Sequence, residues 1–123
     1  MILIVDDHVD SRCVVMRMLR RFGYDVVEAD GGQEAMDYLR NAEPELIILD
    51  CNMPCVDGLD VLRAVRGDAR LADVPVIVFS ADARDERREE LEALGIQGRI
   101  IKGSTNWDLL AHFATLYAGP GKS

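Results

Sequence analysis

Five short apolar runs divide the chain at regular intervals. They occupy residues 2–5, 25–29, 46–49, 74–79 and 99–101. The runs are rich in β-branched residues, and most of them show no alternation with polar residues, which is typical of strands buried on both faces. The pattern therefore predicts five strands in a sheet that other elements cover on both sides.

Segments with helical periodicity separate these runs and follow the last one. Four of them carry an apolar stripe at the spacing of one helix face. The stripes are Cys13, Met16, Leu19; Ala35, Leu39, Ala42; Leu59, Leu62, Val65; and Leu109, Phe113, Leu116. Another segment, about residues 84–94, is mostly charged, with Leu91 and Leu94 as its main apolar contacts. It is expected to be a helix held loosely by the core, either simply solvated or facing a partner.

Local signals mark the ends of these helices. Asp30 followed by Gln33 resembles a capping box, and Ser104 or Thr105 is placed to cap the last helix. Gly23 and Gly95 follow the first and fourth helical segments, where a left-handed residue is favoured.

The alternation of strand and helix predicts an α/β fold, doubly wound, with a five-stranded parallel sheet and right-handed crossovers. We expect the flavodoxin-like strand order 2-1-3-4-5. The length of 123 residues fits one domain, expected over residues 1–118. Residues 119–123 are expected to form a flexible tail, either a terminus or the stub of a linker.

Composition limits the possible partners and the cellular location of the protein. A formal net charge of -8 disfavours nucleic acid as a partner, and no apolar run reaches the roughly 18 residues of a membrane span. No secretory signal is visible at the start. Three cysteines without a disulfide framework indicate reduced thiols and a cytoplasmic protein. Cys51 and Cys55 are interpreted as small apolar residues rather than half of a zinc site, because no second ligand pair follows.

Polar residues stand where four of the five runs end. These residues are Asp6, Asp7, Asp50, Ser80 and Lys102. In open parallel sheets the carboxyl ends of the strands form the ligand-binding edge, so we expect these side chains to converge. Three carboxylates in one cleft repel each other unless one holds a proton or a cation sits among them, and oxygen ligands of this kind suit Mg²⁺. Asp50 is the candidate nucleophile for phosphoryl transfer to a carboxylate.

These residues, in this order, resemble the receiver domain of two-component response regulators over about residues 1–117. The motifs that carry the resemblance are Asp6-Asp7, Leu49-Asp50 through Pro54 with Gly58, Ser80-Ala81, and Lys102. The resemblance implies that Asp50 accepts a phosphoryl group from a phosphohistidine on a histidine kinase or histidine phosphotransfer protein. It also implies a signalling module that acts on a downstream protein target rather than a turnover enzyme.

The resemblance further implies a role for each site residue. Mg²⁺ would be held by Asp7, Asp50 and the backbone carbonyl of Asn52, with Asp6 acting through a metal-bound water. Ser80, Lys102 and the Ala81 N–H would bind phosphoryl oxygens. Asn52 and Asp82 occupy positions where the family tunes the attack of water on the acyl phosphate.

Two positions depart from the family pattern. Gly103 follows Lys102 where the family usually has proline, so a trans bond or a reshaped loop is expected. Arg99 stands three residues before the lysine, where the family often has an aromatic switch residue. Arg99 is expected either to present charge to a partner or to extend into solvent. The partner surface implied by the resemblance is the fourth helix, the fifth strand and the fifth helix.

Two other functions remain open at this point. One is a Mg²⁺-dependent phosphatase with an aspartate nucleophile, although Asn52 stands where such enzymes have a second aspartate. The other is a pseudo-receiver that binds a partner without phosphorylation, which the changes at Arg99 and Gly103 would permit.

Overall fold

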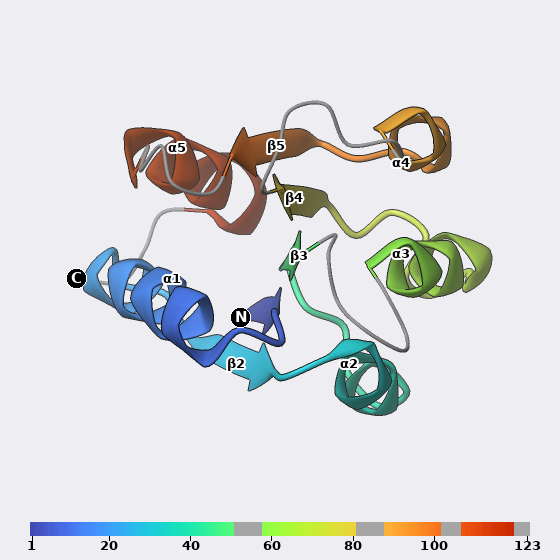
Figure 1. Cartoon of the computed structure of the whole chain (residues 1–123), viewed down its shortest axis with the longest axis horizontal. Helices are drawn as coiled ribbons and strands as arrows, with labels where there is room; N and C mark the ends of the chain where they lie inside the picture. Colours follow the sequence, from blue (N-terminus) through green and yellow to red (C-terminus); the bar gives the residue numbers. More distant parts are fainter. Residues whose placement is uncertain (51–57, 81–87, 102–106, 120–123) are drawn as a thin grey trace.

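The computed structural model describes residues 1–50, 58–80, 88–101 and 107–119, in which strands and helices alternate (Figure 1). The strands are β1 (Ile2–Val5), β2 (Val26–Ala29), β3 (Leu46–Asp50), β4 (Val76–Ser80) and β5 (Gly98–Ile101). The helices are α1 (Val9–Arg21), α2 (Gly32–Leu39), α3 (Gly58–Gly67), α4 (Arg88–Leu94) and α5 (Trp107–Ala118).

The strands form one parallel sheet in the order β2-β1-β3-β4-β5, which confirms the predicted topology. Helices α1 and α5 cover one face of the sheet, and α2, α3 and α4 cover the other (Figure 1). In this order β1 lies between β2 and β3. The residues that follow β1 therefore emerge beside the end of β3.

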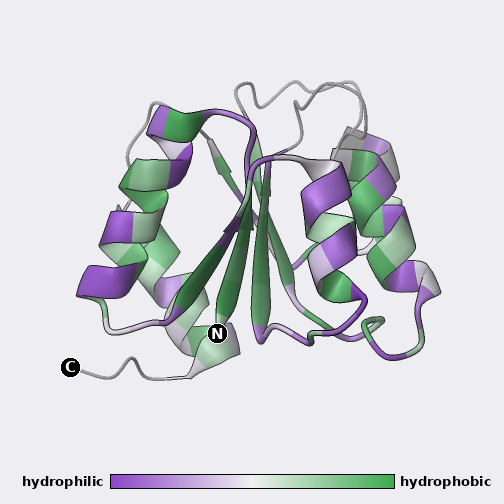
Figure 2. Ribbon diagram, turned by 90° about the horizontal axis from the view of Figure 1, so that it is seen from below, coloured by the Kyte–Doolittle hydropathy of each residue, from purple (hydrophilic) through white to green (hydrophobic). Residues whose placement is uncertain are grey.

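The core consists of two apolar clusters, one on each face of the sheet. Leu3 and Val5 of β1 belong to the cluster beneath α2 and α3. Ile2 and Ile4 belong to the cluster beneath α1 and α5. Figure 2 shows the apolar strands enclosed between two layers of helices that carry both polar and apolar residues. Because both faces of the strand are covered, every position favours an apolar residue, which explains why the strands lack alternation.

The predicted helix stripes agree with the structure in most places. Leu59, Leu62 and Val65 of α3 are all buried against the sheet. Leu91 of α4 is fully buried, so the charged fourth helix does have the apolar contact expected for it. Residues 84–87, the start of the fourth helical segment in the sequence-based prediction, lie outside the described part of the chain.

Three local predictions are wrong. Ala42 was assigned to the stripe of the second helix but lies beyond α2, which ends at Leu39. Leu116 was assigned to the buried stripe of the last helix but is 60% exposed, whereas Leu110 and Ala114 are the buried residues of α5. This helix is apolar around much of its circumference, so spacing alone did not identify its inner face. The capping box predicted at Asp30 does not form. The N-cap of α2 is Gly31 and not Asp30, and glycine has no side chain that could cap the helix.

The ends of the described helices show how the chain turns. Gly23 and Gly95 have φ values of 94° and 96°, which confirms the predicted left-handed residues after α1 and α4. After α5, the backbone carbonyl of Gly119 accepts a 2.6 Å hydrogen bond from the Tyr24 hydroxyl. Ser104, Thr105 and residues 120–123 lie outside the described ranges. None of the helices described is long and apolar enough to cross a bilayer.

Candidate metal centre

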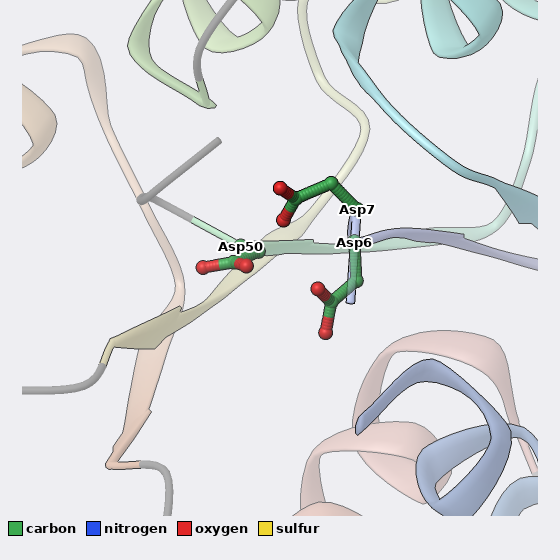
Figure 3. A group of neighbouring side chains, drawn as sticks. All are labelled: Asp6, Asp7 and Asp50. Atoms are coloured by element: carbon green, nitrogen blue, oxygen red, sulfur yellow. The ribbon is translucent and has the colours of Figure 1, made fainter. Parts of the chain in front are cut away.

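Three carboxylates meet where β1 and β3 end. Val5 and Leu49 are register partners in these neighbouring strands, so Asp6 and Asp50 follow at the same level of the sheet. One carboxylate oxygen from each of Asp6, Asp7 and Asp50 lies within 4.8 Å of the others (Figure 3). The strand order thus brings Asp50 beside two adjacent acids that precede it by more than forty positions in the sequence.

The three acids differ in their exposure to water. Asp6 is 5% exposed and Asp50 is 3% exposed, whereas Asp7 is an exposed residue. Buried carboxylates are costly unless hydrogen bonds or a cation compensate the charge. An oxygen-only donor set that is buried on one side and open to water on the other fits a hard divalent cation that keeps part of its hydration shell. The residues present therefore fit Mg²⁺.

Backbone contacts hold Asp6 at the end of β1. Its N–H donates to the carbonyl of Ala29, at 3.1 Å, which extends the pairing with β2 by one residue. Its carboxylate oxygen Oδ1 accepts a hydrogen bond from the backbone N–H of His8, at 2.9 Å. The first turn of α1 is therefore fixed to the acid that precedes it.

A polar group beside these acids was not predicted from the sequence. The side chain of Arg12 contacts both the Asp6 carbonyl and the Glu28 carboxylate. Nearby, a side-chain hydrogen bond from the protonated Glu34 carboxyl to Asp30 raises the pKa of Glu34 above its ordinary value, and burial and the charge of Asp30 act in the same direction. The only sequence signal for this network is that Arg12 falls in the first turn of the helix after the acidic pair.

The other predicted site residues are described only in part. Ser80 is the last residue of β4, and its register partner is Ile101, the residue before Lys102. The Ser80 side chain lies outside the described part of the structure. Five further site residues lie entirely outside the described ranges: Asn52, Ala81, Asp82, Lys102 and Gly103. The expectation about the Lys102–Gly103 bond also falls on these residues.

Arg99 does not extend into solvent, so one of the two alternatives expected for it is wrong, and the other, that it presents charge to a partner, stays a prediction. Its neighbours Gly98 and Ile100 pack on the α5 side of the sheet, which turns Arg99 toward the face covered by α4. The terminal nitrogens Nη1 and Nη2 of Arg99 are buried, and neither has a hydrogen-bond partner among the residues that the structure describes. The residue lines a hollow of about 270 Å³ together with Glu92, Ile96, Gln97 and Gly98.

Comparison with known proteins identifies the same family along nearly the whole chain. Residues 2–114 match the family model described as the response regulator receiver domain. The chemotaxis protein CheY of Pseudomonas aeruginosa is 37% identical over 105 residues, which cover 85% of this chain and 85% of that protein. CheY1 of Helicobacter pylori (strain 26695) is 37% identical over 108 residues, which cover 85% of this chain and 86% of the relative.

Solved structures share the fold. CheY4 of Vibrio cholerae superimposes with a TM-score of 0.85 at 29% identity, covering 94% of this chain and 96% of that one. The receiver domain of the sensor histidine kinase PA1611 from Pseudomonas aeruginosa, with a magnesium ion coordinated in its active-site cleft, gives a TM-score of 0.87 at 27% identity and covers 96% of both chains. TrrA of Thermotoga maritima, in complex with Mg²⁺-BeF, gives 0.82 at 28% identity, covering 94% of this chain and 96% of that one.

Proposed function

The chain belongs to the response regulator receiver domain family, and from that premise we propose that Asp50 accepts a phosphoryl group from a histidine kinase or a histidine phosphotransfer protein. The observation that carries this proposal is the meeting of the Asp6, Asp7 and Asp50 carboxylates within 4.8 Å. Asp50 ends a strand whose other residues are all apolar and buried. A carboxylate in such a place is better explained by chemistry than by folding.

The proposed cofactor is Mg²⁺. Asp7 and Asp50 would bind it directly together with the Asn52 backbone carbonyl, and Asp6 would hold one of its waters. The positive charge of the ion would stabilise the negative charge of the phosphoryl oxygens and reduce the repulsion among the acids. The magnesium ion in the receiver domain of PA1611 supports this assignment.

In the proposed reaction, a carboxylate oxygen of Asp50 forms a bond to phosphorus. The bond between phosphorus and the histidine nitrogen of the donor breaks, and its electron pair returns to the imidazole. Ser80, Lys102 and the Ala81 N–H would bind phosphoryl oxygens as negative charge spreads over them. Asp50 serves as the acceptor and leaves the reaction modified, which is why we propose a signalling module and not a turnover enzyme.

The phosphorylated form would act on a downstream protein target in the cytoplasm, and neither nucleic acid nor membrane is proposed as a partner of this domain. The proposed partner surface is formed by α4, β5 and α5, with Arg99 and Gly103 as the positions that distinguish this chain. Phosphorylation would shift an equilibrium between two conformations of this surface.

Intact-mass spectrometry after incubation with acetyl phosphate tests the proposal. The wild-type protein should gain the mass of one phosphoryl group in the presence of Mg²⁺ and not after chelation. Asp50→Asn should gain nothing under either condition, while Asp37→Asn, an exposed acid on α2, should behave as wild type. Absence of labelling with Mg²⁺ would favour a pseudo-receiver. Continuous release of phosphate from a small phosphoester would favour a phosphatase.

A further inference from the structure

Arg12 stands apart from the other arginines of α1. Its side chain is only 15% exposed, whereas Arg17, Arg20 and Arg21 are exposed on the same helix. Its backbone N–H donates to the His8 carbonyl at 3.0 Å, in the first turn of the helix. The backbone that carries Arg12 is therefore fixed close to the acidic pair.

The guanidinium of Arg12 joins two strand ends. Nη1 donates to the backbone carbonyl of Asp6 at 2.8 Å, and Nε lies 3.1 Å from Oε1 of Glu28 on β2. Ile4 and Glu28 are register partners, so the anchor stands on the strand next to β1. A guanidinium can make two such contacts in fixed directions because its donors form a rigid planar fork.

These contacts complete the fixation of Asp6. Its N–H is bound by Ala29, its carboxylate oxygen Oδ1 by the N–H of His8, and its carbonyl by Arg12. The carbonyl of Asp6 belongs to the peptide plane that leads into Asp7. Asp7 is exposed, so the direction of this peptide, and not packing around the side chain, decides where its carboxylate lies.

We propose that Arg12 is a positioning residue for the metal centre: it holds the Asp6–Asp7 peptide in the orientation that directs the Asp7 carboxylate toward Asp50, and Glu28 anchors it in that task. This inference rests on the proposed function, because it assumes that these acids bind Mg²⁺.

Positioning and charge have opposite effects on Mg²⁺ binding, so they can be separated. The positive charge of Arg12 repels a nearby cation, and its removal alone would tighten binding. Loss of the fork would loosen the acids and weaken binding. Arg12→Lys keeps the charge but presents a single ammonium group without a planar fork, and Arg12→Gln removes the charge as well.

Isothermal titration calorimetry with MgCl₂ on the full chain tests the inference without any phosphodonor. Both Arg12 variants should bind Mg²⁺ more weakly than wild type, on the order of 10-fold, as is usual when a group that orients metal ligands is lost. Arg17→Gln, which removes a charge from an exposed position of the same helix, should bind within about twofold of wild type, since exposed charges are strongly screened.

Three results would overturn parts of this account in distinguishable ways. Unchanged affinity in Arg12→Lys with tighter binding in Arg12→Gln would show that Arg12 acts only through charge. Absence of Mg²⁺ binding by wild type would overturn the proposed function itself.

If thermal melting shows that the Arg12 variants do not fold, Glu28→Gln provides the test, because it leaves Arg12 in place and weakens its anchor. It should also lower Mg²⁺ affinity, and wild-type affinity in a folded Glu28→Gln variant would contradict the inference.

Discussion

The ring of Phe113 on α5 lies directly over Gly98 on β5, so that a Cβ atom added to Gly98 would stand 2.4 Å from Cζ of the ring. Glycine is required here by the close approach of a side chain and not by backbone conformation. The contact fixes which face of β5 each residue occupies. Arg99, the next residue, therefore faces the opposite layer.

Gly98→Ala should destabilise the fold by about 1–3 kcal/mol, because the ring must move to admit a methyl group. Urea unfolding followed by circular dichroism measures the change. Gly67→Ala adds the same methyl group at a position where no atom of the described residues lies within 4 Å of the new Cβ, and it should cost nothing. Phe113→Leu in the Gly98→Ala background should recover part of the loss. Equal stability of the two alanine variants would show that the ring does not constrain Gly98.

Arg99→Met should make the protein more stable. The variant keeps a long unbranched side chain but removes a buried guanidinium whose terminal nitrogens have no hydrogen-bond partner in the described part of the chain. An unsatisfied buried polar group costs about 1–3 kcal/mol, and the gain should be of that size. The midpoint of urea unfolding should rise for Arg99→Met, whereas exposed Arg17→Met should change the free energy of unfolding by less than about 0.5 kcal/mol. A clear loss of stability in Arg99→Met would mean that the guanidinium is satisfied in solution.

Arg66 joins the loops that precede β4 and β5, at the end of the strands opposite to the three carboxylates. Its guanidinium donates to the carbonyls of Val74 and Gly95 at 2.8 Å each, and to that of Ala72 at 3.1 Å. Burial lowers the pKa of Arg66, but a guanidinium stays charged at neutral pH. The side chain therefore ties the end of α3 to the turn that follows α4.

Arg66→Lys should lose about 1.5–3 kcal/mol of stability, because one ammonium group cannot serve three carbonyls in different directions. Chemical unfolding provides the measurement. Arg63→Lys on the same helix keeps the positive charge at an exposed ion pair with Asp60, at 3.7 Å, and should be nearly neutral. A similar small effect in both variants would contradict the role assigned to Arg66.

Two other acids, Asp30 and Glu34 at the start of α2, predict a pH dependence of stability. The hydrogen bond that the protonated Glu34 carboxyl donates to Asp30 raises the pKa of Glu34 above its ordinary value of 4.5, so the folded protein holds the Glu34 proton more tightly than the unfolded chain does. The resulting stabilisation is present below pH 4.5 and is lost as the pH rises through the higher folded pKa.

Glu34→Gln should therefore melt at a higher temperature than wild type near neutral pH, with the difference shrinking toward acidic pH. Melting curves recorded across this range give the test. Glu43→Gln, which loses an ion pair with Arg70 at 3.9 Å, should show no such gain. A difference between Glu34→Gln and wild type that does not vary with pH would argue against the shared proton.

The sequence predicted most of this architecture because buried parallel strands leave a strong signal. Apolar runs predicted β1 and β3. The polar residues that end these runs, Asp6 and Asp50, were predicted to converge. The inner face of α5 was misjudged, since a helix that is apolar on several sides lets spacing point to Leu116 as readily as to Leu110. Arg12 was not predicted because its partners, a carbonyl and a side chain on another strand, are set by tertiary packing, which periodicity does not record.

The most direct test of the account is to locate the phosphoryl group chemically. After treatment with acetyl phosphate and Mg²⁺, sodium borohydride reduces an acyl phosphate on aspartate to homoserine, and peptide mass spectrometry then identifies the modified residue. The account predicts homoserine at position 50, dependent on Mg²⁺, with Asp6 and Asp7 unchanged. Homoserine at another aspartate, or at none, would contradict it.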